Sequence, residues 1–227
     1  MDALEERLAE VDARIVDAAH AAGRDPRALT RIVVTKFHPA TIAERLYELG
    51  VRDFGENRQQ ELSEKVAAVG ARDGLVWHFI GQAQTNKARA IRAAASVVHS
   101  VDRAKLADAL DAAGGPGPAL DVLLQVNLTD DLGRGGVAPA DLPALVDHVA
   151  ALRTLRVRGV MGVAPLGEAP ASAFARLHDC SARVQASVPD ATWISAGMTA
   201  DFAEAIAAGA THLRIGSAIT GPRPVPR

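Results

Sequence analysis

The sequence predicts an α/β fold, a single (β/α)8 TIM barrel with one extra N-terminal helix. First, short apolar runs rich in β-branched residues alternate with helical patterns along most of the chain. Second, eight such β/α units fit within roughly 190 residues, which is the spacing of a compact TIM barrel. Third, no Gly-x-Gly-x-x-Gly follows the first strand, which argues against the alternative, an open doubly wound sheet.

The elements follow from periodicity and turn residues. Residues 3–22 are expected to form a helix, because apolar residues from Leu4 to Val16 recur at helical spacing and Gly23 follows as a stop. Strands are then expected over 31–36, 52–55, 76–81, 96–101, 120–127, 157–164, 192–197 and 212–217. Helices are expected after the first seven, over 40–49, 57–69, 85–94, 103–113, 140–152, 170–187 and 200–207. The connections are short, which predicts one domain over 1–227, with 1–24 as a helix packed on the barrel.

Composition limits the function classes. The chain has 227 residues, 48% of them hydrophobic, which is ample for one large core. A net charge of −2 without a basic stripe, and only 4% aromatic residues, argue against a nucleic-acid partner. No apolar run reaches membrane-spanning length, and the charged N-terminus lacks a signal-peptide core. A single cysteine, Cys180, suits a reducing compartment. We therefore expect a cytoplasmic protein without a membrane partner.

A lysine ends the first predicted strand. Ile32, Val34 and Lys36 share one side of that strand, because strand residues alternate between faces. Pro39 then stops the strand. In a TIM barrel the chemistry collects at the carboxyl ends of the strands. Lys36 is therefore either a spare surface charge or a reactive amine.

Two loops at the end of the chain have the composition of an anion site. TIM barrels often bind phosphate with the loops after strands seven and eight. Ser195, Gly197 and Thr199 supply two hydroxyls and a backbone that a ligand can approach closely, and Thr199 is a good N-cap. Gly216 and Ser217 repeat this chemistry after strand eight. Taken singly, these residues could be only helix caps and tight turns; taken together, they favour a phosphate.

Arg214 shares a strand face with His212 and Gly216. A buried arginine needs a partner, either a carboxylate such as Glu56 or an acceptor on a ligand. A lysine and a phosphate cup across one barrel mouth suggest a phosphorylated aldehyde held as a Schiff base. Pyridoxal 5′-phosphate (PLP) is the commonest such ligand; a Schiff-base aldolase acting on a sugar phosphate would use the same parts.

The chain resembles the PLP homeostasis proteins, the YggS/PROSC family. The resemblance runs from near residue 30 to the end of the chain, and the combination of motifs is specific although each is weak alone. The matching stretches are Val34-Thr-Lys36, Phe54-Gly-Glu-Asn57, Trp77-His-Phe-Ile-Gly81, Thr85-Asn-Lys87, Val126-Asn127, Arg158-Gly-Val-Met161, Ser195-Ala-Gly-Met-Thr199 and Arg214-Ile-Gly-Ser217.

The resemblance implies a barrel like the N-terminal domain of alanine racemase, with PLP as a Schiff base on Lys36. It implies Asn57 beside the ring and Arg214 facing the pyridine nitrogen. The implied phosphate cup consists of Ser195, Gly197, Met198, Thr199, Gly216 and Ser217. The implied role is to carry and buffer PLP in the cell. We also expect a monomer, with PLP-dependent apo-enzymes and small amino acids as possible partners.

The sequence departs from the family pattern at two positions. His38 stands where many members have a second lysine, and Arg134 stands where a lysine is common. Lys87 is kept at a helix start, where it is either part of the site or a solvated surface lysine. These differences leave the roles of Lys87 and Arg134 open.

The alternative function is a PLP-dependent amino-acid racemase of the alanine racemase type. Racemisation needs an acid and a base on opposite faces of the cofactor, and in alanine racemase a second domain supplies one of them. This chain ends at Arg227, and its one tyrosine, Tyr47, is expected outside the barrel. His78 and His99 are expected to be satisfied core residues. We therefore expect a PLP carrier with no catalytic residues, and the scattered histidines predict no metal site.

Overall fold

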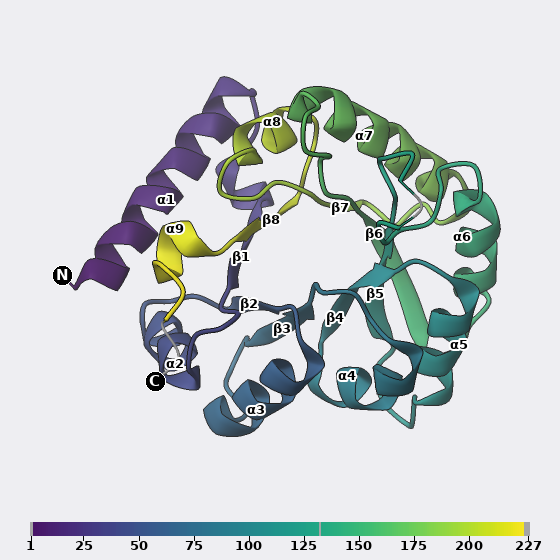
Figure 1. Cartoon of the computed structure of the whole chain (residues 1–227), viewed down its shortest axis with the longest axis horizontal. Helices are drawn as coiled ribbons and strands as arrows, with labels where there is room; N and C mark the ends of the chain where they lie inside the picture. Colours follow the sequence, from purple (N-terminus) through teal and green to yellow (C-terminus); the bar gives the residue numbers. More distant parts are fainter. Residues whose placement is uncertain (1, 132, 225–227) are drawn as a thin grey trace.

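The computed structural model describes residues 2–131 and 133–224, and its eight parallel strands close into a barrel (Figure 1). The strands follow one another around the ring in sequence order, and β8 pairs with β1. This confirms the predicted TIM barrel. The strands are β1 (Thr30–Val34), β2 (Asp53–Glu56), β3 (Val76–Phe79), β4 (Val97–Val101), β5 (Leu120–Gln125), β6 (Leu155–Met161), β7 (Trp193–Ser195) and β8 (His212–Ile215).

Helices follow each strand and form the outer layer of the ring (Figure 1). They are α1 (Ala3–Ala21), α2 (Ala40–Glu48), α3 (Gln59–Val69), α4 (Ala88–Ala94), α5 (Ala104–Ala112), α6 (Leu142–Ala150), α7 (Pro170–Ser187), α8 (Phe202–Ala207) and α9 (Ser217–Thr220). Two 3₁₀ turns, η1 (Pro26–Ala28) and η2 (Thr85–Lys87), precede β1 and α4. The short helix α9 after β8 was not anticipated by the sequence patterns.

The barrel strands end earlier than the sequence patterns suggest. The first strand stops at Val34 and not at Lys36, and β7 stops at Ser195 and not at Gly197. Apolar periodicity predicts where a strand is buried, but pairing ends where the backbone turns away from its neighbour. The residues that leave the ladder early at β1, β7 and β8 belong to the loops at the barrel mouth.

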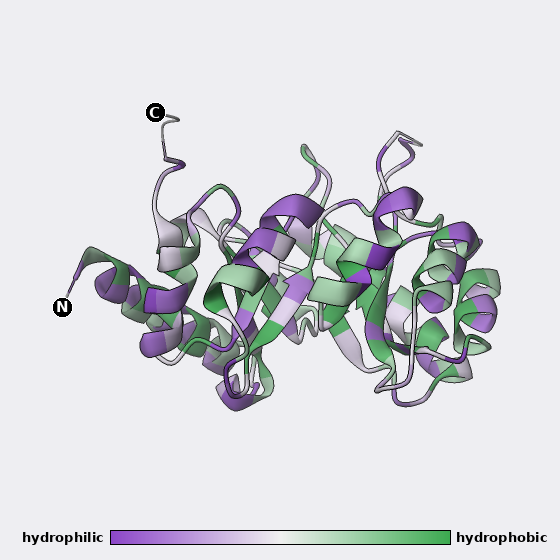
Figure 2. Ribbon diagram, turned by 90° about the horizontal axis from the view of Figure 1, so that it is seen from below, coloured by the Kyte–Doolittle hydropathy of each residue, from purple (hydrophilic) through white to green (hydrophobic). Residues whose placement is uncertain are grey.

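The main core lies between the strands and the helices, while the barrel interior is divided in two. Apolar colour runs along much of the strands, and hydrophilic residues gather on the outer helices (Figure 2). Inside the ring, Val97, Leu123 and Met161 form a separate apolar cluster from β4, β5 and β6. The opposite part of the interior is polar, with three buried histidines, Ser195 and Arg214. Branched aliphatic residues usually fill a TIM barrel, so this polar half is unusual.

The N-terminal helix α1 packs beside α8 and α9 (Figure 1). Asp2 caps it, because its carboxylate accepts hydrogen bonds from the backbone amides of Leu4 and Glu5. Arg7 Nε donates to the Ile219 carbonyl oxygen at 2.7 Å, and this ties α1 to the short helix after β8. None of the helices within 2–131 and 133–224 combines the length and apolarity needed to span a bilayer.

Candidate functional site

A cavity of about 370 Å³ opens at the carboxyl ends of β1, β2, β7 and β8. It brings together side chains from loops more than 170 positions apart in the sequence, as the barrel order requires. Its wall contains most of the residues singled out from the sequence. The lining residues are Val34, Lys36, Asn57, Ile80, Val163, Met198, Thr199, Ala200, Arg214, Gly216 and Ser217.

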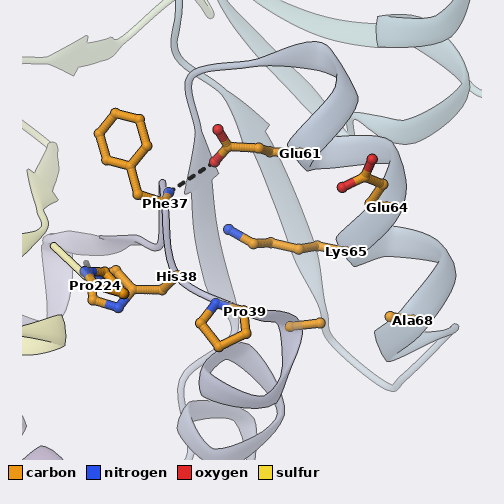
Figure 3. A pocket seen from close by; sticks show the side chains of 9 residues that line it. Phe37, His38, Pro39, Glu61, Glu64, Lys65, Ala68 and Pro224 are labelled. Atoms are coloured by element: carbon orange, nitrogen blue, oxygen red, sulfur yellow. Dashed lines mark hydrogen bonds between the residues drawn. The ribbon is translucent and has the colours of Figure 1, made fainter. Parts of the chain in front are cut away.

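Lys36 reaches this cavity from a tight turn after β1. Its side chain is exposed, in contrast to the buried strand residues Val33 and Val34. The next residue, Phe37, has a φ of 68°, in the left-handed region that non-glycine residues rarely adopt. The Phe37 backbone amide donates to Glu61 Oε2 at 2.8 Å, which holds this conformation from α3 (Figure 3). Strained residues of this kind are typical of ligand sites, where the surrounding structure fixes them.

A buried ion pair fixes the same turn from below. Lys65 on α3 donates to Glu56 Oε1 at 2.5 Å and to the Thr35 carbonyl oxygen at 2.7 Å. The Thr35 hydroxyl also donates to Glu56 Oε1, at 2.5 Å. Burial raises the pKa of Glu56, while the Lys65 ammonium and the Thr35 hydroxyl act in the opposite direction. Sequence patterns missed Lys65, because a lysine on an amphipathic helix is usually a solvated surface residue.

The Lys36 turn separates two cavities. Lys36 lines the inner one, whereas Phe37 and His38 line an outer cavity of about 530 Å³ between α2 and α3 (Figure 3). Lys65 points from α3 toward this turn (Figure 3). His38, which replaces the second lysine of the family pattern, is buried, and burial lowers its pKa. His38 lines the outer cavity and is not among the described residues that line the inner one.

The loops after β7 and β8 present backbone amides to the inner cavity. Asp201 Oδ1 accepts from the Met198 amide at 2.6 Å, and α8 begins at Phe202 with Asp201 as its first flanking residue. The expected capping role of Thr199 is therefore wrong. On this wall, the amides of Thr199, Ala200, Ser217 and Ala218 have no hydrogen-bond acceptor among the described residues. Unpaired amides and two hydroxyls at one wall form a site for an anion.

Gly197 supports this wall from behind. It has a φ of +88°, and a Cβ atom added there would lie 2.7 Å from Ala205 Cβ. Its carbonyl oxygen accepts from the Arg214 amide at 3.0 Å. Gly197 is not among the described residues that line the cavity. Its role is to let the β7–α8 loop pack closely on α8.

Arg214 forms part of the cavity wall and is 5% exposed. Its Nη1 donates to Ser195 Oγ at 2.6 Å, and its Nη2 donates to the Gly162 carbonyl oxygen at 2.9 Å. Burial lowers the pKa of Arg214 to about 10, so the side chain stays cationic at neutral pH. Ser195 is fully buried and faces the barrel interior, and it is not among the described residues that line the cavity. The hydroxyls available to a ligand are those of Thr199 and Ser217.

Asn57 lies between the inner cavity and a neighbouring one of about 500 Å³ that Lys87 also lines. Its Oδ1 is buried without a hydrogen-bond partner among the described residues. Gly81 allows this position, because a Cβ added to it would lie 1.9 Å from the Asn57 carbonyl oxygen. Arg134 lines a smaller cavity of about 180 Å³, which adjoins the inner one at Val163.

The remaining acid–base candidates lie away from the cavity. His78 and His99 are buried in the barrel and hydrogen-bonded to each other, as expected for satisfied core residues. Tyr47 lies on α2, and its hydroxyl donates to the Asp73 carbonyl oxygen at 2.9 Å. Across residues 2–131 and 133–224, no three His, Cys, Asp or Glu side chains are grouped to hold a metal ion.

The arrangement can hold a particular kind of ligand. An amine from Lys36 stands in the same cavity as an anion-binding wall of free amides and two hydroxyls. Arg214 adds a buried cationic donor, and Val34, Ile80 and Val163 add an apolar surface. A flat, phosphorylated aldehyde with an acceptor atom on its ring satisfies all of these groups.

Comparisons with known proteins agree with this chemistry. The family model for the alanine racemase N-terminal domain matches residues 16–224. The chain is 43% identical over 227 residues to the pyridoxal phosphate homeostasis protein of Pseudomonas aeruginosa, covering 98% of this chain and 97% of the relative. It is 36% identical to the Escherichia coli K12 protein of that name, covering 98% of both chains.

Solved structures give the same picture. PipY of Synechococcus elongatus with PLP bound superposes with a TM-score of 0.84 at 35% identity, covering 96% of this chain and all of PipY. Alanine racemase from Corynebacterium glutamicum shares the fold, with a TM-score of 0.68 at 15% identity. This chain covers 59% of that racemase.

Proposed function

This chain belongs to the family of pyridoxal phosphate homeostasis proteins, which carries the alanine racemase N-terminal domain, and from this premise we propose that it binds PLP to maintain the intracellular PLP supply. The observation that carries the proposal is the single cavity in which exposed Lys36 meets free backbone amides and buried Arg214. These groups match PLP, because an amine can take its aldehyde, an anion site its phosphate, and an arginine its ring nitrogen.

The unpaired polar groups of the cavity support the fit. Four amides of the β7–α8 and β8–α9 loops, those of Thr199, Ala200, Ser217 and Ala218, have no acceptor among the described residues, and the Asn57 Oδ1 atom has no donor. A buried polar atom without a partner is costly, so Asn57 Oδ1 favours a ligand that donates to it, and the free amides beside the cavity favour an anionic group on that ligand. A phosphate would accept from the amides, and a hydroxyl on the ring would donate to Asn57.

Each residue has a proposed role. The Lys36 amine would hold PLP through its aldehyde as a Schiff base, with the loss of one water. The hydroxyls of Thr199 and Ser217 and the free amides of the two loops hold the phosphate, with Met198 and Gly216 lining the cavity beside them. Arg214 donates to the pyridine nitrogen. Two residues of the predicted cup act indirectly: Gly197 sets the loop and Ser195 holds the Arg214 guanidinium.

The proposed role is to hold PLP and release it, not to turn over amino acids. Relatives over the full length of the chain are named for PLP homeostasis. A donor such as Arg214 at the ring nitrogen disfavours protonation there, which makes PLP a weaker electron sink. The racemase alternative needs a second acid–base group at the cofactor, and Tyr47 and the two barrel histidines are engaged elsewhere.

Several finer features belong to the same proposal. We take residues 1–227 as one PLP-binding domain, with the helix in 1–24 packed on the barrel, that acts as a monomer. PLP-dependent apo-enzymes are its proposed recipients, and small amino acids are proposed to compete for the bound PLP. The proposed compartment is the cytoplasm, which the single buried cysteine supports.

Borohydride reduction of the PLP-loaded protein tests the proposal. Reduction makes the bond between lysine and PLP permanent, and mass spectrometry of the digested protein locates it. We expect the label on Lys36 and a loss of the visible absorbance in Lys36→Ala. Lys87→Ala is the matched control and should retain both. A label on another lysine contradicts the assignment of Lys36, and a protein that takes no label contradicts PLP binding.

A further inference from the structure

A continuous set of polar side chains crosses the barrel interior beneath the cavity. His78 Nε2 lies 3.0 Å from Asp53 Oδ1, and His78 Nδ1 lies 2.9 Å from His99 Nε2. His99 Nδ1 lies 2.9 Å from Ser195 Oγ, which accepts from Arg214 Nη1 at 2.6 Å. Five side chains from β2, β3, β4, β7 and β8 thus join the cavity wall to the opposite end of the barrel. We call these five residues the interior relay.

The two ends of the relay differ in exposure and charge. The Asp53 side chain is 28% exposed at the amino end of β2, while His78, His99 and Ser195 are at most 1% exposed. Arg214, at the other end, is a buried cation whose two hydrogen-bond acceptors, the Ser195 hydroxyl and the Gly162 carbonyl, are both uncharged. A carboxylate and a guanidinium therefore stand at opposite ends of two imidazoles and a hydroxyl.

When both imidazoles are neutral, the two ends of the relay favour one direction for its hydrogen bonds. Arg214 can only donate, so the Ser195 hydroxyl accepts from it and donates its own hydrogen to His99 Nδ1. Neutral His99 then carries its proton on Nε2 and donates to His78 Nδ1. His78 in turn carries its proton on Nε2 and donates to the Asp53 carboxylate. The reverse direction would leave the unprotonated His78 Nε2 facing Asp53 Oδ1, with two acceptors opposed.

The surroundings keep the central histidine neutral. Burial, together with His78, His212 and Arg214, holds the pKa of His99 well below its usual range. An uncharged His99 has one donor and one acceptor nitrogen, which is what a directional set of hydrogen bonds requires. Hydrogen bonds aligned in one direction polarise one another.

We propose that the interior relay, directed by Asp53, positions the Arg214 guanidinium for the ligand in the inner cavity. Asp53, His78, His99 and Ser195 touch no ligand in this scheme; they are positioning residues. Ser195 fixes one arm of the guanidinium, and donating its own hydrogen to His99 makes its oxygen a stronger acceptor for Arg214. The proposal rests on the proposed function in one respect, because it takes the ligand that Arg214 meets to be PLP.

The first experiment is done on the full-length protein freed of PLP. Histidine labelled with ¹⁵N distinguishes the three protonation forms of each ring in a two-bond ¹H–¹⁵N correlation spectrum, with assignments from single histidine replacements. At pH 7.5 we expect both His78 and His99 to be neutral with the proton on Nε2. A charged His99, or a His99 with its proton on Nδ1, overturns the proposal.

The second experiment removes the acceptor that directs the relay. Asp53→Ala should shift part of the His99 population to the Nδ1–H form and weaken PLP binding roughly two- to thirty-fold, the range for replacements within a coupled network. Asp53→Asn retains an oxygen acceptor for His78 and should restore both the His99 spectrum and most of the affinity. Asp121→Ala is the matched control, because Asp121 also lies near the amino end of its strand but pairs with Arg156.

The outcomes separate the relay from the proposed function. If Asp53→Ala and Asp121→Ala give the same His99 spectrum and the same PLP affinity, Asp53 does not direct the relay and the proposal is overturned. If wild type binds no PLP, the proposed function fails, while the histidine spectra of the PLP-free protein still decide the relay.

Discussion

Two buried cations stand on opposite sides of the candidate site, and they are neutralised in different ways. Lys65, on the β1/β2 side, contacts the Glu56 carboxylate directly at 2.5 Å. Arg214, on the β7/β8 side, has a hydroxyl and a carbonyl as its acceptors, and its carboxylate lies at the far end of the interior relay. Both side chains are about 5% exposed or less.

The difference separates a structural cation from one available to a ligand. The charge of Lys65 is compensated locally, and its two hydrogen bonds hold the Thr35 carbonyl and Glu56 beneath the Lys36 turn. Arg214 hydrogen-bonds to two uncharged acceptors, and the Asp201 carboxylate acts on its pKa without bonding to it, so an acceptor on a ligand gains more from Arg214 than from Lys65. Burial of a charge is thus a weak guide to function; the nature of its partners is more informative.

The largest expected effect on stability comes from breaking the ion pair between Lys65 and Glu56. Lys65→Met should lower the free energy of unfolding by about 3–5 kcal/mol, because it leaves Glu56 buried and uncompensated. The loss should be smaller at pH 5 than at pH 8, since a Glu56 with a raised pKa is tolerated as the neutral acid at low pH. Urea unfolding monitored by tryptophan fluorescence at the two pH values measures the loss of stability and its pH dependence. The double variant Lys65→Met/Glu56→Gln should recover most of the loss; strict additivity would contradict a direct pair.

The second effect is a pH dependence of the free energy of unfolding that comes from the buried His212. Burial, and then His78, lower the pKa of His212 to about 3, with Asp53 acting in the opposite direction. The folded pKa lies below the unfolded one, so the unfolded state binds the extra proton and stability falls as pH drops below about 6.5. The expected slope from this residue is about 1.4 kcal/mol per pH unit. Urea unfolding between pH 6.5 and 4.5 should show that the free energy of unfolding depends less steeply on pH in His212→Asn than in wild type, by that amount. Equal slopes in the two proteins would contradict a neutral buried His212.

The smallest expected effect on stability comes from Arg214. Arg214→Met should change the free energy of unfolding by only about 1 kcal/mol, because replacing a buried charge by an apolar side chain of similar length removes its desolvation cost as well. The same variant should lose much of its PLP affinity, which spectrophotometric titration with PLP measures. Met198→Leu is the matched control on the same wall. A loss in stability as large as that of Lys65→Met would remove the distinction between the two cations.

The sequence was sufficient to predict the barrel and most of the residues of the cavity wall. Strand alternation and the TIM-barrel rule placed Lys36, Thr199, Arg214 and Gly216 at one mouth, and the structure brings them together there. These predictions depend on local periodicity and on chain order, both of which are properties of the sequence itself.

The parts that sequence patterns missed depend on contacts between distant segments. The turn after β1 starts at Thr35 because Lys65, 30 positions later, binds the Thr35 carbonyl. Ser195 has the composition of a phosphate ligand, yet its hydroxyl faces His99, 96 positions earlier. Neither contact has a local signal, since a lysine on a helix and a serine in a loop are common in surface positions.

Closure of the barrel limits how another protein could approach this one. The described strands form a ring in which β8 hydrogen-bonds to β1, so the sheet offers no edge strand for a partner to extend. Any protein that takes up the ligand must therefore dock through side chains and loops. The loops beside exposed Lys36 and Met198, which is 40% exposed, lie at the opening through which the ligand must leave. Recognition and release would then occur on the same small surface, and a docked recipient would also shield the released aldehyde from other amines.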